Sequence, residues 1–412
     1  GPYEVVRSEL TNAEGRVIPL GVFARKSLWQ HMDADYIFEK TREGFEFFER
    51  EFGYPYPFEK YDQLFVPEYN MGAMENIGAV TFTESYVFRS QVTDAMRERR
   101  VITILHELAH MWFGDLVTMR WWNDCWTIFV ASEKSWAYRQ DQLPSTHPIV
   151  AEIRDLEDVM VNFDGITYAK GASVLKQLVA WVGRKPFMQG VHEYFMKHEY
   201  SNTELTDLLS ELEAQSGRDL GDWSKKWLET AGVNTLRPVF ELDAEGKYAS
   251  FSIAQTAVAE YPTLRPHRIA VGLYEVQGEA LVRTQRLELD VDGATTSVPE
   301  LVGTAQPALL LLNDDDLSYA KIRLDERSLD TAAAHLGGFE SSLARSLVWG
   351  TLWDQTRDGE LPASRFVDIV LAHISAETNS TVLRTLIQQL LLAASSYVAP
   401  ERRTATLERV AD

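Results

Sequence analysis

The stretch VITILHELAHMWF, residues 101–113, is apolar nearly all round and yet contains two histidines and a glutamate. Residues four apart lie on one face of a helix, so the imidazoles of His106 and His110 can point at one metal ion. Glu107 falls beside them, where it can take a proton from a water. Ionisable groups in such a helix are costly unless they are paired or bind a metal. The alternative is a buried helix whose histidines only satisfy hydrogen bonds, and the apolar neighbours make it the weaker interpretation.

Two histidines alone are an incomplete zinc site. A catalytic zinc takes three protein ligands and leaves its fourth position to water. In zincins of the glutamate type the third ligand is a Glu on a following helix, and here Phe129 stands at its position. The nearest carboxylates, Asp124 and Glu133, are at the wrong offset. The sequence therefore predicts a centre for one zinc ion per chain that lacks its third ligand.

Composition and charge narrow the possible partners. The 412 residues carry a formal net charge of −21 with a pI near 4.9. This acidity argues against nucleic acid or an anionic membrane as a partner and suits a cationic ligand such as a peptide amino terminus. No apolar run approaches the ~18 residues of a membrane helix. Cys125 is the single cysteine, which excludes internal disulfides and favours a cytoplasmic location. Nothing in the sequence indicates the oligomeric state.

The apolar pattern predicts a multidomain α+β protein in four parts. Residues 1–25 alternate like strands and are expected to be a remnant of an N-terminal β domain. Mixed patterns over 26–235 predict the catalytic domain. Short strands separated by turns predict a β-sandwich over 236–325, and helical spacing returns over 326–412 as the start of a helical domain. Because the chain opens in a strand pattern and closes in a helical one, we expect a piece of a longer protein.

The sequence also predicts individual helix ends, turns and strands. Asp33 is expected to cap a helix that ends at Gly53, and a further helix is expected over 166–182. Ser201-Asn202-Thr203-Glu204 has capping-box spacing. Asp314-Asp315-Asp316 suggests a calcium loop, but it lacks the spacing of one, so a charged turn is the better interpretation. Sandwich strands are expected at 251–253, 269–273, 287–291 and 309–312.

Two further segments contain candidate site residues. Gly72-Ala73-Met74-Glu75-Asn76 combines small residues, which permit close backbone approach to a ligand, with a single carboxylate. An ordinary loop with a solvated Glu75 is an equal alternative from the residues alone. Tyr168 stands in the first turn of the 166–182 helix, where packing on its neighbours is the simpler interpretation.

Taken together, these motifs resemble the aminopeptidase N family of zinc metallopeptidases. Gly72-Ala73-Met74-Glu75-Asn76 is similar to its exopeptidase motif, residues 106–114 to its zinc helix, and Tyr168-Ala169-Lys170-Gly171 to its catalytic tyrosine motif. The resemblance runs from residue 1 to about residue 330 and weakly beyond. It implies a thermolysin-like catalytic domain, then a β-sandwich, then a helical domain.

The resemblance also implies the chemistry: release of N-terminal residues from peptides by attack of a metal-activated water. His106 and His110 are then zinc ligands, Glu107 is the general base, and Tyr168 donates a hydrogen bond to the oxyanion. Glu75 binds the free α-ammonium of a peptide substrate, which argues against an endopeptidase.

The resemblance breaks after Trp126. Family members continue there with a segment that carries the zinc glutamate, and a block of roughly 20–30 residues, including a whole helix, is expected to be missing from this chain. Its loss is expected to expose the apolar wall of the zinc helix. Three interpretations follow: a working aminopeptidase whose segment is lost from this sequence, a catalytically dead member that acts as a peptide-binding or scaffold protein, or rescue by Glu133 or Asp124 as a substitute ligand.

Overall fold

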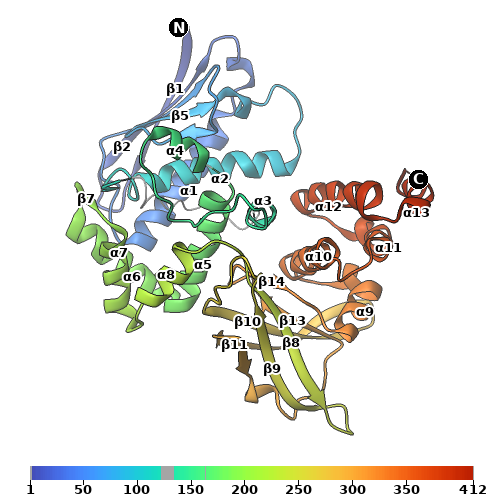
Figure 1. The fold of residues 1–412 in the computed structure, drawn as a ribbon. Coiled ribbons are helices and arrows are strands. Elements are labelled where there is room, and N and C mark those ends of the chain that lie inside the picture. Colours follow the sequence, from blue (N-terminus) through green and yellow to red (C-terminus); the bar gives the residue numbers. More distant parts are fainter. Residues whose placement is uncertain (1, 122–133, 163, 412) are drawn as a thin grey trace. The chain divides into compact units, whose positions relative to one another are not determined.

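The computed structural model describes residues 2–121, 134–162 and 164–411, which form two compact units (Figure 1). The first unit comprises the described residues of 1–128, 152–159 and 182–220, and the second those of 129–151, 160–181 and 221–412. Helices and strands are mixed in both, as the α+β prediction requires.

The first unit is built on a five-stranded sheet in the order β1-β2-β3-β5-β4. Its strands are β1 (Tyr3–Thr11), β2 (Val17–Arg25), β3 (Tyr61–Val66), β4 (Ala73–Met74) and β5 (Ala79–Thr83). β1 and β2 form an antiparallel hairpin, and β2 then pairs in parallel with β3 along residues 20–24. The boundary expected near residue 25 therefore does not separate two sheets. Strand alternation in the sequence does not reveal which strands pair.

Two long helices, α1 (Ala34–Phe52) and α2 (Asp94–His110), pack together beside this sheet. Gly44 permits the close approach, because a Cβ there would lie 2.6 Å from a Leu105 methyl. α1 ends at Gly53 in the left-handed conformation (φ 62°), as predicted. Asp33 does not cap its helix through its side chain; it accepts a hydrogen bond from buried Arg100 instead.

Smaller elements complete the first unit. They are η1 (Trp29–His31), η2 (Glu84–Tyr86), β6 (Val117–Met119), α6 (Arg184–His198), β7 (Ser201–Thr203) and α7 (Leu205–Ser216), and α4 (Leu156–Asn162) begins in this unit. The predicted capping box is wrong by one turn: Glu204 is the N-cap of α7, and its reciprocal partner is Asp207. Ser201 to Thr203 instead form strand β7, which pairs with β6.

The second unit contains two sheets that share one apolar core. A three-stranded sheet has the order β11-β10-β13 and a four-stranded sheet the order β12-β9-β8-β14. The strands are β8 (Thr235–Leu242), β9 (Tyr248–Thr256), β10 (His267–Gln277), β11 (Ala280–Val291), β12 (Thr295–Ser297), β13 (Leu309–Asp314) and β14 (Lys321–Ile322). Ile253 of one sheet and Val271 of the other are fully buried in the same cluster. All four strands expected from the period-two pattern are confirmed.

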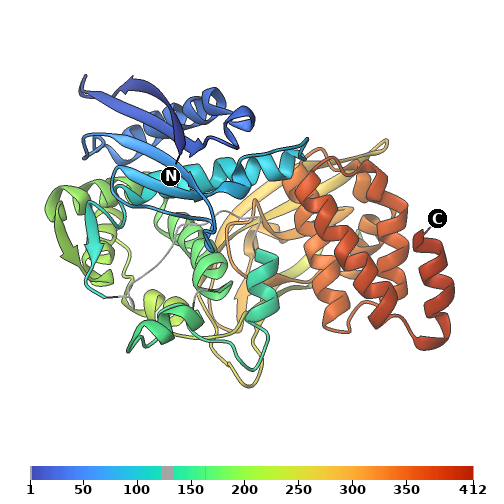
Figure 2. The same cartoon turned by 90° about the horizontal axis from the view of Figure 1, so that it is seen from above.

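Helices pack on the other face of the three-stranded sheet. They are α9 (Glu326–His335), α10 (Ser342–Arg357), α11 (Ala363–His373), α12 (Ser380–Leu392) and α13 (Pro400–Ala411), with short turns η7 (Leu336–Gly338), η8 (Ile374–Ala376) and η9 (Ala393–Tyr397). The short turn η6 (Pro299–Leu301) instead contacts β9, and its Leu301 is buried in the core between the two sheets. Figure 2 shows α10, α11 and α12 side by side. Leu309 and Leu311 of β13 are buried in the same core as Leu352 and Val370 of these helices.

The remaining helices of the second unit are α3 (Lys134–Gln140), the π-helical turn η5 (Ile166–Lys170), α5 (Gly171–Val182) and α8 (Gly221–Leu228). A helix over 166–182 was predicted; the structure divides it into a π-helical turn and an α-helix. Asp314-Asp315-Asp316 is a charged turn: Asp315 pairs with Arg283 and Arg286, and Asp316 with Lys134. Within the described residues, no helix has the length and apolarity needed to cross a membrane.

Candidate metal centre and catalytic residues

The last turns of helix α2 contain the candidate metal ligands. Their positions are fixed because the apolar side of the helix is packed in the core. Ile104 and Leu108 are fully buried, and the next apolar residues, Met111 and Trp112, are buried as well. None of the residues 101–117 is exposed, so the expected exposure of an apolar wall on this helix is wrong. Packing with α1 supplies cover that the sequence pattern did not reveal.

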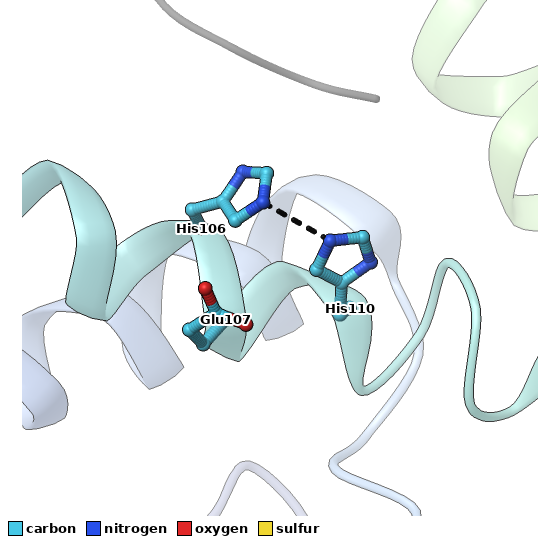
Figure 3. Close-up of side chains that lie close together, drawn as sticks. All are labelled: His106, Glu107 and His110. Atoms are coloured by element: carbon cyan, nitrogen blue, oxygen red, sulfur yellow. Dashed lines mark hydrogen bonds between the residues drawn. The ribbon is translucent and has the colours of Figure 1, made fainter. Parts of the chain in front are cut away.

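His106 and His110 face one another one turn apart, as their spacing predicted (Figure 3). Their Nε2 atoms are 3.2 Å apart. Two nitrogens that each bind a tetrahedral zinc at ~2.0–2.1 Å are separated by about 3.3 Å. Nδ1 of His110 lies 2.9 Å from the carbonyl oxygen of Phe113 and can donate to it, which leaves Nε2 as the ligand atom. The two imidazoles therefore fit one metal ion.

Glu107 lies between the histidines along the chain and is 4% exposed. Its Oε2 atom is buried without a hydrogen-bond partner. Burial raises the pKa of Glu107 to about 9, and the charges of Glu75 and Asp115 add to the effect. A nearby cation favours the charged form of a carboxyl group. An unpartnered carboxylate oxygen beside two imidazoles is thus suited to accept a proton once a cation is bound.

The positions considered for the third ligand lie outside the residues that the structure describes. Within residues 2–121, 134–162 and 164–411, the one group able to hold a metal ion is His106, Glu107 and His110, whose ligand atoms lie within 4.8 Å of one another. Phe129, Asp124 and Glu133 all fall in the segment that the structure does not describe. Rescue by Glu133 or Asp124 therefore stays a prediction.

The Gly72–Asn76 motif lies next to the histidines in the first unit. Ala73 and Met74 form edge strand β4, which pairs with Phe82 and Thr81 of β5. Glu75 follows directly, half-buried, with Oε1 3.9 Å from Nδ1 of His110. The structure thus brings together residues more than 30 positions apart in the sequence, as the interpretation of Glu75 as a site residue requires.

Tyr168 belongs to the second unit, in the middle of the π-helical turn η5. Its side chain is half-buried, whereas Thr167, Ala169 and Lys170 around it are buried. π-Helical turns are rare and are often found at functional sites. A simple α-helical start, as the apolar spacing indicated, would have aimed the side chains of this turn differently.

Sequence reasoning missed Asp115, the residue five positions after His110. Its amide donates to the carbonyl of His110, and its Oδ2 atom is buried without a hydrogen-bond partner. Burial raises the pKa of Asp115 to about 8, with Glu75 adding to the rise. A carboxylate directly after an apolar helix is the signal that could have found it.

Two family descriptions match the chain. Residues 36–128 and 125–227 match the Peptidase family M1 domain, and residues 309–411 match the ERAP1-like C-terminal domain. The peptidase match falls into two segments that overlap at 125–128, next to Trp126, after which a block of residues is expected to be missing.

Three named proteins illustrate the similarity in sequence. Aminopeptidase N of Streptomyces lividans is 56% identical over 99% of this chain and 52% of its own length. Tricorn protease-interacting factor F2 of Thermoplasma volcanium is 36% identical over 51% of this chain and 30% of its own length. Leucyl aminopeptidase of Saccharolobus solfataricus is 34% identical over 51% and 29%. The chain thus spans about half the length of the first relative and less of the others.

The alignment with the Streptomyces lividans protein also bears on the missing block. It spans 442 positions, whereas 99% of the 412 residues is about 408, so about 34 positions hold no residue of this chain. This is enough for a helix with its connections. The break at 125–128 lies where the deletion was expected, and the number of empty positions is somewhat larger than the roughly 20–30 predicted.

Proposed function

We propose that this chain, in which residues 36–128 and 125–227 match the Peptidase family M1 domain, carries the catalytic centre of a zinc-dependent aminopeptidase that acts on peptides with a free amino terminus. One observation carries the proposal: the Nε2 atoms of His106 and His110 are 3.2 Å apart, and the neighbouring Glu107 has its Oε2 atom buried without a hydrogen-bond partner. One zinc ion per chain is proposed. When bound, it would polarise the scissile carbonyl and lower the pKa of a water to about 7.

Glu107 is proposed as general base and then general acid. Its carboxylate takes a proton from the attacking water and returns it to the leaving amine. Its Oε2 atom is buried without a hydrogen-bond partner, so this oxygen is available to accept the proton. The neighbouring carboxyl groups of Glu75 and Asp115 raise the pKa of Glu107 further, which strengthens it as a proton acceptor.

Glu75 is proposed to bind the α-ammonium group of the substrate. It follows edge strand β4, whose outer edge carries no strand among the described residues, so a peptide backbone can approach Gly72 to Asn76. A charge-assisted bond to the ammonium fixes the amino terminus close to the histidines. The net charge of −21 favours a cationic terminus as well. Tyr168 is proposed as the hydrogen-bond donor to the oxyanion.

The missing glutamate decides whether this chain turns over substrate. We attribute the break after Trp126 to loss of the segment that carries the third ligand, because the peptidase match breaks there and about 34 aligned positions are empty. The catalytically dead scaffold has no support, since the relatives named above are aminopeptidases or a protease-interacting factor. The single Cys125 favours the cytoplasm as the compartment.

The test compares two purified proteins: the 412-residue chain, and the same chain with a Leu-Asn-Glu-bearing segment restored after Trp126. Zinc per chain and hydrolysis of alanyl and leucyl amides are measured for both. We expect loosely held zinc and negligible hydrolysis for the first, and one tightly held zinc with turnover for the second. Robust turnover by the unrestored chain would direct attention to Glu133. Absence of turnover from both would refute the proposed function.

A further inference from the structure

Lys170 is an unusual residue for its surroundings. It is the last residue of η5, two positions after Tyr168, and its side chain is 0% exposed. Its Nζ atom lies 2.9 Å from Oδ2 of Asp141, whose side chain is also 0% exposed. Nζ also donates to the carbonyl oxygen of Gly232 at 3.1 Å. An ion pair this deeply buried is costly to form, and hydrophobic residues of similar size are often at least as stable. Stability of the fold therefore does not explain its presence.

The Asp141 carboxylate joins three segments of the second unit. Its Oδ1 atom accepts from the amide of Gly232 at 2.9 Å and from the hydroxyl of Thr146 at 2.6 Å. Its Oδ2 atom accepts from the hydroxyl of Tyr319 at 3.2 Å as well as facing Lys170. Gly232 lies just before the first sandwich strand β8, and Tyr319 between β13 and β14. The Lys170–Asp141 pair thus connects the π-helical turn η5, which contains Tyr168 and is called the tyrosine turn below, to the segment that precedes strand β8.

The segment that leads to strand β8 is held in place by buried Arg265. Arg265, 1% exposed, donates to the carbonyl oxygens of Lys226, Thr230 and Ala231 at 2.8–3.0 Å. These carbonyls belong to the end of α8 and the segment that leads to Gly232. The segment before Gly232, whose carbonyl oxygen accepts from Lys170, is therefore itself held by several charge-assisted hydrogen bonds from Arg265.

The other end of the tyrosine turn is fixed as well. Asp164 accepts from the amides of Ile166 and Thr167, and its second oxygen lies 3.1 Å from Nε2 of His147. A Cβ on Gly165 would lie 2.9 Å from the ring of Trp136, so α3 presses directly on this turn. Tyr168 sits between these two fixed points, in a π-helical geometry that a free chain would not keep.

We propose that Lys170, held by Asp141, is a positioning residue that fixes the π-helical turn and so aims the Tyr168 hydroxyl. This inference rests on the proposed role of Tyr168 as oxyanion donor. Burial lowers the pKa of Lys170 to about 8, so the lysine is charged at neutral pH. Displacing a catalytic group by ~1 Å from a distant mutation can cost about 100-fold in rate, so modest loosening of this turn is sufficient to matter.

The test removes the pair as a unit. Lys170→Met alone would leave Asp141 buried without its cation and destabilise the fold, so the probe is Lys170→Met with Asp141→Asn. Lys176→Met is the matched control, because Lys176 stands in the following helix α5, is 39% exposed and lies 3.5 Å from its acid, Asp316. Each variant is made in the chain as it stands and in the chain with the restored segment.

Hydrogen exchange on the unrestored chain gives the readout that needs no activity. We expect amides of residues 164–171 and 230–234 to exchange at least about tenfold faster in the pair variant, with helix α6 unchanged. Lys176→Met should leave both segments unchanged. Unchanged exchange of residues 164–171 in the pair variant overturns the inference, whatever the activity of the restored chain.

Kinetics on the restored chain test the consequence for Tyr168. The pair variant should lower kcat by about tenfold or more and change KM by less than about twofold, and it should cause no further loss in a Tyr168→Phe background. An equal loss in that background, or an unchanged kcat, overturns the positioning role. If Tyr168→Phe alone leaves kcat unchanged, or the restored chain does not turn over, the proposed function fails first and the inference falls with it.

Discussion

Asp354 in helix α10 offers a quantitative test of how burial acts on a carboxyl group in this fold. It is 7% exposed, and the cations near it are already engaged: Lys321 donates to Asp358 at 2.6 Å, and Arg323 pairs with Asp358 and Glu360. Burial therefore dominates and raises the pKa of Asp354 from 3.8 to about 7, although Lys321 partly opposes it. The change proposed is Asp354→Asn, which keeps the shape and removes the titration.

The direction of the pH effect on stability follows from the raised pKa of Asp354. An acid whose pKa is raised in the folded state contributes stability below its unfolded pKa and loses it as the pH rises through the folded value. At 1.36 kcal/mol per pKa unit, the raised pKa of Asp354 lowers the free energy of unfolding of the wild-type protein by about 1.6 kcal/mol at pH 5 and by about 4 kcal/mol at pH 8. We expect the stability of Asp354→Asn relative to wild type to be about 2–3 kcal/mol more favourable at pH 8 than at pH 5.

Urea unfolding followed by circular dichroism at the two pH values measures this difference. Asp368→Asn is the control, because Asp368 lies in the neighbouring helix α11, pairs with Arg409 and has a side chain that is 57% exposed. It should show almost no pH-dependent difference. If Asp354→Asn shows the same small difference as the control, the nearby lysine and arginines neutralise the carboxylate after all, and burial does not dominate.

Three catalytic predictions concern the chain with its segment restored. Glu107→Ala should abolish turnover while leaving zinc bound, because Glu107 is a base and not a ligand; zinc analysis and amide hydrolysis check both, and loss of zinc would make Glu107 a ligand instead. Tyr168→Phe should lower kcat by about 100-fold with little change in KM, since its hydrogen bond forms mainly in the transition state; equal effects on both constants would indicate ground-state binding. Glu75→Ala should raise KM most for substrates with a free amine, because their ammonium group loses a charge-assisted bond. Acetylated peptides should be poor substrates for both the variant and the wild type, and internal cleavage of an acetylated peptide at a comparable rate would refute the exopeptidase assignment.

Local features of the sequence predicted local structure well. The helix that carries His106 and His110, the left-handed stop at Gly53 and the period-two strands of the second unit were all visible in residue spacing. Each depends on interactions between residues only a few positions apart, so the sequence contains the complete information. The ring-to-ring approach of the two histidines is a consequence of helix geometry alone.

Only the tertiary structure decided which distant segments meet. It paired β2 of the β1–β2 hairpin with β3, brought Glu75 within 3.9 Å of His110, and buried Lys170 against Asp141 and Gly232. No pattern in a single segment reports such pairings, because strand alternation is the same for any partner and a buried lysine has the same sequence signal as an exposed one. Residue spacing determines the zinc-binding face of α2, whereas the surroundings that raise the pKa of Glu107 arise from burial and from Glu75 and Asp115, which packing brings beside it.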